Sequence, residues 1–166
     1  MKRLFLWNNR YLWFLKIIVM YSTLKFVHSY WAYLVLLVIL IATINALISF
    51  FSKKEYGPKD FRLALFGLIV THLQLLIGLI LYFVSPLGLQ SLTNNGMGTV
   101  MKDSMLRLYA VEHPTVMILT VVFITIGYSK HKKKLVSKPK FKMLAIFYTI
   151  GLILMLSRIP WDQWFS

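Results

Sequence analysis

Histidine is the only strong metal ligand that this 166-residue sequence offers, because the chain contains no cysteine. Three of its four histidines, His28, His72 and His113, lie within or beside long apolar runs. Ionisable side chains at membrane depth are costly, so each of the three is a candidate for function. Two histidines from different helices at one depth are what axial ligation of a b-type haem requires.

His28 and His113 are the pair whose depths match. At 1.5 Å per helical residue they would lie about 6 and 10 Å below the outer ends of their helices, and His72 about 18 Å. The pair is therefore interpreted either as axial haem ligands or as hydrogen-bonding residues between helices. His72 is either an additional ligand, or a substrate or proton site, or a partner for a neighbouring helix. Pro114 disfavours helical dihedrals in the residue before it, which predicts a kink that redirects His113.

Two arginines and a glutamate belong to the same outer layer. Guanidinium groups bind carboxylates through paired hydrogen bonds, so Arg107 and Arg158 are predicted contacts for haem propionates. The alternative is that both side chains snorkel to the membrane interface. Glu112 either orients one of the histidines from behind or pairs with an arginine. His131 stands among lysines, which predicts a solvated side chain.

Long apolar runs must position these side chains. Hydrophobic residues make up 58% of the chain and charged residues 14%, with the charges clustered between the runs, as soluble domains rarely show. The run from Phe26 to Phe51 has no Lys, Arg, Asp or Glu over 26 positions, and Leu63 to Val84 has none over 22. A membrane crossing needs about 20 residues. Two further runs are centred on residues 114–129 and 141–159. We therefore expect an all-α integral membrane protein, with four transmembrane helices at about 24–51, 62–85, 106–129 and 141–159 in one domain over residues 20–166.

Lysine and arginine in the short links between these helices predict the orientation. The link between the third and fourth helices is the most basic, with Lys130, Lys132, Lys133, Lys134, Lys138, Lys140 and Lys142. The first link is basic too, whereas the segment from Pro86 to Met105 carries only Lys102, balanced by Asp103. The basic links are thus expected on the cytoplasmic side, and both termini outside.

Residues 1–19 fit this orientation poorly, because their basic side chains would be carried to the outer face. A fifth crossing would place Arg10 in mid-membrane, at a cost of about 2.5–3.5 kcal/mol. No small-residue cleavage site follows that would indicate a signal peptide. We therefore interpret residues 1–19 as an N-terminal extension, either an interfacial helix or a segment that precedes a start at Met20.

Four local sequences carry a resemblance to a known family. They are His28 to Trp31, His72 to Leu79, Arg107 through Glu112-His113-Pro114, and Ser157 to Trp161. Together they resemble small bacterial membrane proteins commonly labelled cytochrome B. The resemblance covers residues 20–165 and implies a haem-binding membrane protein.

More distantly, the four helices are similar to one half of heme A synthase. In that four-helix unit, histidines of the first and third helices ligate a haem, and a Gln-Leu-Leu-Gly-like stretch marks the helix between them. Carried over by position, the resemblance implies His28 and His113 as ligands and matches Gln74 to Gly78 to the intervening stretch.

The leading hypothesis is a protein of the inner (cytoplasmic) membrane that binds heme b and exchanges electrons with respiratory-chain proteins or a quinone, as a carrier rather than a catalyst. One alternative is a cofactor-free subunit or assembly factor of a larger membrane complex, and a second is a small transporter that uses His72. Most of the basic residues behind the net charge of +14 flank membrane segments. They therefore predict contact with lipid headgroups, and nucleic acid is not the expected partner.

Overall fold

The computed structural model describes the backbone of residues 2–164 and the side chains of residues 18–164. Its elements are α1 (Lys2–Phe51), α2 (Pro58–Val84), α3 (Leu89–Lys102), α4 (Ser104–Arg107), the π-helix η1 (Leu108–Glu112), α5 (His113–Lys132), α6 (Ser137–Ser157) and the 3₁₀-helix η2 (Trp161–Gln163).

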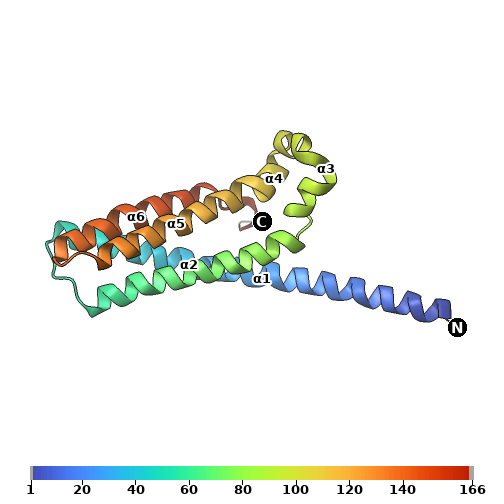
Figure 1. Cartoon of the computed structure of the whole chain (residues 1–166), viewed down its shortest axis with the longest axis horizontal. Helices are drawn as coiled ribbons and strands as arrows, with labels where there is room; N and C mark the ends of the chain where they lie inside the picture. Colours follow the sequence, from blue (N-terminus) through green and yellow to red (C-terminus); the bar gives the residue numbers. More distant parts are fainter. Residues whose placement is uncertain (1, 165–166) are drawn as a thin grey trace.

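Helix α1 is long because nothing in its sequence interrupts it. No glycine or proline occurs before Gly57, and these are the residues that most weaken a helix. The first part of α1 extends away from the other helices, and the later part packs against α2 and α6 (Figure 1). The predicted boundary between residues 19 and 20 falls within this continuous helix, so the separate N-terminal extension stays a prediction.

Asp60 ties the turn between α1 and α2 together. Its carboxylate accepts hydrogen bonds from the Asn45 side chain at 2.9 Å and from the Gly57 backbone N–H at 3.0 Å, and it pairs with the Lys54 ammonium at 2.9 Å. Pro58 starts α2, where its fixed φ suits a first helical turn and its missing N–H needs no partner. Because Asp60 is only 4% exposed, these partners stabilise a charge that is costly to bury alone.

Helices α1, α2, α5 and α6 form a ring of antiparallel neighbours around one core (Figure 1). Helix α1 contacts α2 and α6, and α5 contacts the same two helices. Tyr148 of α6 is fully buried, and its hydroxyl donates to the Ala64 carbonyl of α2 at 2.7 Å. A Cβ on Gly127 would lie 2.6 Å from the Phe147 Cβ. Glycine therefore sets the close approach of α5 to α6, as small residues do between membrane helices.

Helices α3 and α4 cover one end of the ring, which we call the pocket end (Figure 1). Helix α2 stops at Val84 because Pro86 offers no N–H for a continuing helix. Gly88 then allows the chain to turn, since a Cβ there would lie 2.1 Å from the Tyr82 carbonyl oxygen. Helix α3 contains a break at Gly96, whose φ of 76° favours glycine. The segment that the sequence presents only as a link is thus largely helical.

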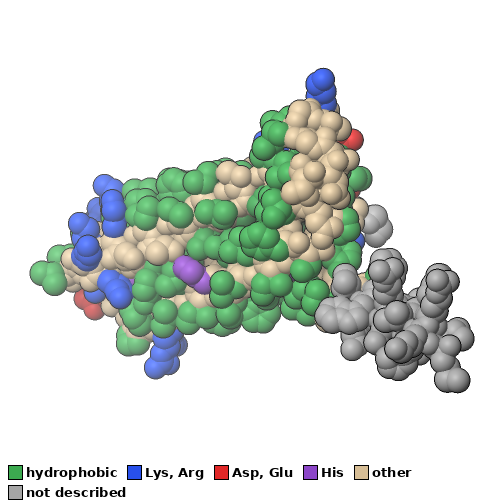
Figure 2. Space-filling model, turned by 45° about the vertical axis from the view of Figure 1, so that its right-hand side comes forward, with side chains coloured by type: hydrophobic (Ala, Val, Ile, Leu, Met, Phe, Trp, Pro, Cys, Tyr) green, Lys and Arg blue, Asp and Glu red, His purple; other side chains and the backbone are tan. Residues whose placement is uncertain are grey.

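Four helical segments are long and apolar enough to cross a membrane: Ile18–Phe51, Pro58–Val84, Ser104–Lys132 and Ser137–Ser157. No strand occurs within residues 2–164. The predicted all-α chain with four membrane-spanning helices is therefore confirmed, and the chain is a multi-pass membrane protein. Apolar side chains cover the flanks of the ring, where lipid would contact them (Figure 2).

The end opposite the pocket end is rich in lysine and arginine, and we call it the basic end (Figure 2). Its residues come from the α1–α2 and α5–α6 turns and their flanks: Lys53, Lys54, Lys59, Arg62, Lys130, Lys132, Lys133, Lys134, Lys138, Lys140 and Lys142. Both links that the sequence marks as basic therefore lie on the same side of the bundle. The predicted orientation requires both basic links to face the same side of the membrane.

His131, at the basic end, corrects one expectation. The sequence predicts a solvated side chain, but His131 is only 1% exposed. Its ring lies 5.6, 6.2 and 5.0 Å from the rings of Tyr56, Phe61 and Tyr128, measured between centroids. Helix α5 continues to Lys132 and carries His131 beneath the α1–α2 turn, while the neighbouring Lys132 points to the exposed side. The local sequence shows that the neighbours of His131 are charged, but it does not show on which face of the helix His131 lies.

Candidate functional site

An apolar pocket opens inside the bundle at the pocket end. It has a volume of about 230 Å³ and is lined by α1, α2, α5, the end of α6 and the segments that connect or follow them. Most of the surface of its wall is apolar, although several polar side chains also line it, among them the two histidines, Lys25 and Gln74. This composition is typical of a site that holds a largely apolar ligand and orients it by a few polar contacts.

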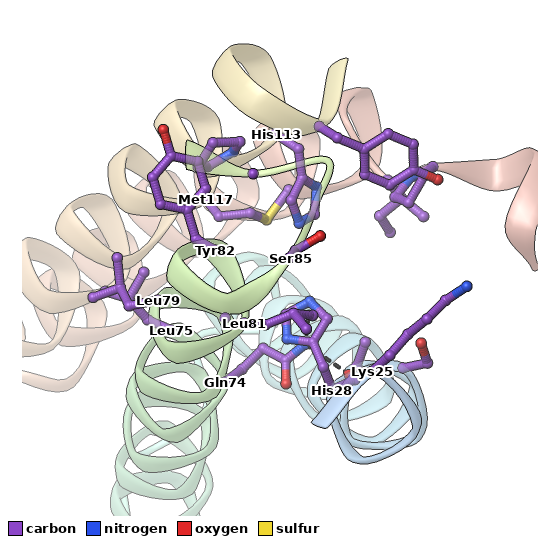
Figure 3. A pocket seen from close by; sticks show the side chains of 18 of the residues that line it. Lys25, His28, Gln74, Leu75, Leu79, Leu81, Tyr82, Ser85, His113 and Met117 are labelled. Carbon is purple, nitrogen blue, oxygen red and sulfur yellow. Dashed lines mark hydrogen bonds between the residues drawn. The ribbon is translucent and has the colours of Figure 1, made fainter. Parts of the chain in front are cut away.

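His28 of α1 and His113 of α5 face each other across this pocket (Figure 3). Their ring centroids are 6.2 Å apart, and the ring planes are inclined by 78°. The structure therefore brings together the two histidines that the sequence placed at similar depth. They approach from helices that are not neighbours in sequence, so a ligand between them would be held from both sides.

The proton of His113 is fixed by its surroundings. His113 Nδ1 lies 2.7 Å from the backbone carbonyl oxygen of Arg158, just beyond the end of α6. A carbonyl oxygen only accepts, so Nδ1 carries the proton in neutral imidazole and Nε2 keeps its lone pair. A backbone carbonyl behind the ring is the usual partner of a metal-bound histidine, because it sets the tautomer and increases the basicity of the ligand.

The turn before His113 is a π-helix, and Pro114 accounts for it. Proline has no N–H, and its ring crowds the carbonyl four residues earlier, which belongs to Ala110. That carbonyl instead accepts a hydrogen bond from the Tyr82 hydroxyl at 3.2 Å, while the His113 N–H reaches back to the Leu108 carbonyl. The predicted departure of His113 from helical dihedrals is wrong, since its φ is −59° and its ψ −54°. The wider turn η1 accommodates the proline instead.

His28 is held by α2 on the opposite wall of the pocket. The Gln74 side-chain amide donates to the His28 backbone carbonyl at 3.0 Å and lies 3.4 Å from His28 Nε2. Gly78 leaves room for the ring, since a Cβ there would lie 3.0 Å from His28 Cε1. Two buried atoms of this wall, His28 Nδ1 and Gln74 Oε1, meet no hydrogen-bond partner among the described residues. Buried polar atoms without partners are rare in proteins and point to a ligand or solvent contact.

Glu112 lies between the two predicted propionate contacts. Its carboxylate accepts from Arg107 Nε at 2.9 Å and pairs with Arg158 Nε at 3.2 Å. Of the two roles predicted for Glu112, the structure shows pairing with arginine. Neither arginine is among the described residues that line the pocket. The two guanidinium groups therefore lie beside the pocket, where they fasten the end of α6 to the turn that carries His113.

His72 lies apart from the pair, and its ring does not line the pocket that the described residues form. Its Nδ1 lies 2.8 Å from the Leu68 carbonyl oxygen, four residues earlier in α2, and therefore donates to it. Its Nε2 lies 3.4 Å from the Thr125 hydroxyl of α5. Because the Thr125 hydroxyl donates its proton to the Val121 carbonyl at 2.7 Å, this approach is a packing contact between α2 and α5, and the role of His72 stays a prediction.

Sequence reasoning missed three pocket residues that the structure emphasises. Lys25 lines the pocket three residues before His28, and Tyr82 supports the π turn from α2. Gly78 entered the sequence analysis only as the last residue of the Gln74 to Gly78 stretch. The three-residue spacing of Lys25 and His28 places both on one helix face, and this spacing could have indicated Lys25 from the sequence. The contacts of Tyr82 and Gly78 depend on how α2 packs, which no local pattern shows.

Fold and pocket together define an all-helical multi-pass membrane protein with an apolar, histidine-flanked pocket at one end. Comparisons of the chain with protein families, with curated proteins and with solved structures find no match. The resemblance to cytochrome B proteins and to heme A synthase therefore stays an expectation that the sequence raises.

Proposed function

We propose that this protein is a membrane b-type haem protein that holds one haem between His28 and His113 and carries electrons. The observation that supports the proposal most is the pair itself, two imidazole rings on opposite walls of an apolar pocket with centroids 6.2 Å apart. Two axial imidazoles on one iron would place their ring centres about 6 Å apart, from about 2 Å for each metal–nitrogen bond and about 1 Å within each ring.

The chemistry of the donor set also fits a haem. His113 presents Nε2 with a free lone pair, because the Arg158 carbonyl holds the proton at Nδ1. His28 Nδ1 is buried without a hydrogen-bond partner among the described residues, and its lone pair would be open to iron in the tautomer that carries the proton on Nε2, beside the Gln74 amide. Leaving such an atom unsatisfied costs about 1–3 kcal/mol, so a metal contact there would remove a penalty.

Each part of the site then has a role. Haem iron, when bound, supplies reversible one-electron chemistry. The Arg158 carbonyl orients His113, and Gln74 and the gap at Gly78 position His28. The apolar wall excludes water and so lowers the local dielectric constant. This environment would influence the reduction potential of a bound iron.

The orientation and partners are part of the same proposal. The lysines of the basic end support a cytoplasmic position for that end, and the proposal has the pocket end and both termini on the outer side of the inner (cytoplasmic) membrane. A haem in that layer would exchange electrons with respiratory-chain proteins or with a quinone at the outer surface. The position of the pocket near one end of the bundle supports such an exchange, because a partner need not enter the membrane deeply.

A difference spectrum of the purified protein tests the proposal. After supplementation with haem, the reduced-minus-oxidised spectrum of the unsubstituted protein should show the α band of a six-coordinate b-type haem. Replacing His28→Ala and His113→Ala together should abolish the band, because both axial ligands are then missing. His72→Ala is the matched control, a histidine of the same membrane domain that lies outside the pocket, and it should keep the band.

Two outcomes would contradict the proposal. One is unsubstituted protein that remains folded and shows no α band even with excess haem, which would favour the cofactor-free subunit. The other is a band that persists in the double variant. Folding of each variant is checked by far-ultraviolet circular dichroism and by its elution as a single species in detergent.

A further inference from the structure

Lys25 is an exposed lysine near the start of the apolar part of α1, three residues before His28. Between Ile18 and Phe51, the whole span of α1 that is apolar enough to cross a membrane, it is the only Lys, Arg, Asp or Glu. A lysine at the centre of such a helix costs about 2.5–3.5 kcal/mol on insertion scales, and less nearer the end. A lysine near the end of a membrane helix can snorkel to the interface, so it is the place of Lys25 at the pocket, and not its depth, that indicates a role.

The spacing between Lys25 and His28 places both residues on one side of α1. Residues three apart lie on the same face of a helix, and both of these side chains line the pocket. Figure 3 shows the His28 ring pointing toward His113, while the Lys25 side chain extends from the same helix to one side of the two rings. Lys25 is also the only Lys, Arg, Asp or Glu among the described residues that line it.

Among the described residues, Lys25 has no partner for its charge. It makes no hydrogen bond and no ion pair with any side chain from residue 18 to residue 164. The arginines at the same end behave differently, because Arg107 and Arg158 both contact Glu112. The positive charge that is available to a ligand in the pocket is therefore that of Lys25, not of the arginines.

We propose that Lys25 is the counter-ion for a carboxylate of the ligand in this pocket, namely a propionate of the haem. This inference rests on the proposed function and replaces the arginines as the first contact of that carboxylate. Lys25 lies about one helical turn before His28 and lines the same pocket, so one ligand with an extended carboxylate arm could contact both residues. A charged hydrogen bond of this kind is about twice as strong as a neutral one.

Binding of haem b and of its dimethyl ester, in which both propionates are uncharged, tests this role. Each is titrated into purified protein carrying Lys25→Met, which keeps the apolar stem and removes the charge, and into Lys25→Arg. Lys25→Met should weaken haem b binding about tenfold or more and leave ester binding unchanged. Lys25→Arg should retain most of the affinity. Lys102→Met, at the end of α3 and outside the pocket, controls for the loss of one positive charge from this end.

The outcomes separate this inference from the function on which it rests. If the unsubstituted protein binds haem b, but Lys25→Met binds it equally well or loses affinity equally for haem and ester, Lys25 is not the counter-ion. If the unsubstituted protein binds neither compound, both proposals fall. If Lys25→Met does not fold, Lys25→Gln takes its place in the same comparison, with the same expected difference between haem and ester.

Discussion

At the scale of single residues, the pocket depends on how closely each histidine is held. His113 has one hydrogen bond from Nδ1 to the Arg158 carbonyl, and the Arg158 side chain in turn contacts Glu112, which directly precedes His113. His28 has the Gln74 amide on one side, and its ring packs against Gly78 on the other. Both histidines are thus positioned by residues outside their own helices, His28 by α2 and His113 by the residue that follows α6.

Gly78 gives a sharp test at this scale. A Cβ at residue 78 would stand 3.0 Å from His28 Cε1, so Gly78→Ala should displace the ring and weaken haem binding roughly tenfold, as overpacking typically costs about 1–3 kcal/mol. Gly98→Ala is the matched control, because a Cβ at residue 98 meets nothing within 4 Å. Haem titration followed by absorbance measures both. Equal affinities in the two variants would show that the ring of His28 is not confined by Gly78.

The sequence predicted the histidine pair but not its supports. His28 and His113 could be found because ionisable side chains in apolar runs stand out and their depths can be counted along each helix. Gly78 and Tyr82 could not, since their importance comes from contacts across helices. His131 was misassigned for the same reason: its neighbours in sequence are lysines, but its neighbours in space are aromatic rings.

At the scale of elements, the third membrane segment is the one that departs from a regular helix. Ser104–Lys132 combines α4, the π turn η1 and α5. The extra residue of the π turn changes the direction in which His113 leaves the helix, and such turns are frequent at functional sites. The Tyr82 hydroxyl stabilises this turn from α2, so the π turn and the α2–α5 contact depend on each other.

Replacing the proline tests that dependence. Pro114→Ala restores an N–H to residue 114, which can bond the Ala110 carbonyl and compete with Tyr82. We expect η1 to revert partly to α-helix, His113 to turn away, and the fraction of six-coordinate haem to fall severalfold in the absorption spectrum. Pro139→Ala, in the first turn of α6 where no amide partner is required, should leave the spectrum unchanged. An unaltered spectrum in Pro114→Ala would mean that the π turn does not direct His113.

The elements differ in how far the sequence foretold them. The four membrane spans follow from apolar runs longer than a crossing requires, and all four are found. Helix α3 was not expected, because its sequence Asn94-Asn95-Gly96-Met97-Gly98 carries turn signals. The π turn was read as a kink, since proline predicts a disturbance of the helix but not which backbone geometry absorbs it.

At the scale of the whole molecule, the two ends of the bundle differ in kind. The basic end gathers the lysine-rich turns, and the pocket end holds the histidine pair, Lys25 and the Glu112 ion pairs. Such an asymmetry favours one orientation in a membrane, with the lysines toward the cytoplasm. It also separates the part of the protein that fixes topology from the part that would do chemistry.

Single-cysteine labelling tests the orientation, and the chain suits it because it has no cysteine of its own. A membrane-impermeant maleimide should label Asn94→Cys, in exposed α3, on intact cells. Lys134→Cys, in the exposed α5–α6 turn, should react only after the membrane is permeabilised. The two variants are each other's control for reactivity. The reverse pattern would place the pocket end inside and overturn the proposed exchange with partners at the outer surface.

The central claim is that His28 and His113 ligate one iron, and electron paramagnetic resonance of the ferric protein tests it most directly. Unsubstituted protein reconstituted with haem should show a low-spin signal alone, because two imidazoles give a strong ligand field. His28→Ala and His113→Ala should each give a high-spin signal that added imidazole returns to low spin, whereas His72→Ala should match the unsubstituted protein. A low-spin signal that survives either single substitution without added imidazole would contradict the claim.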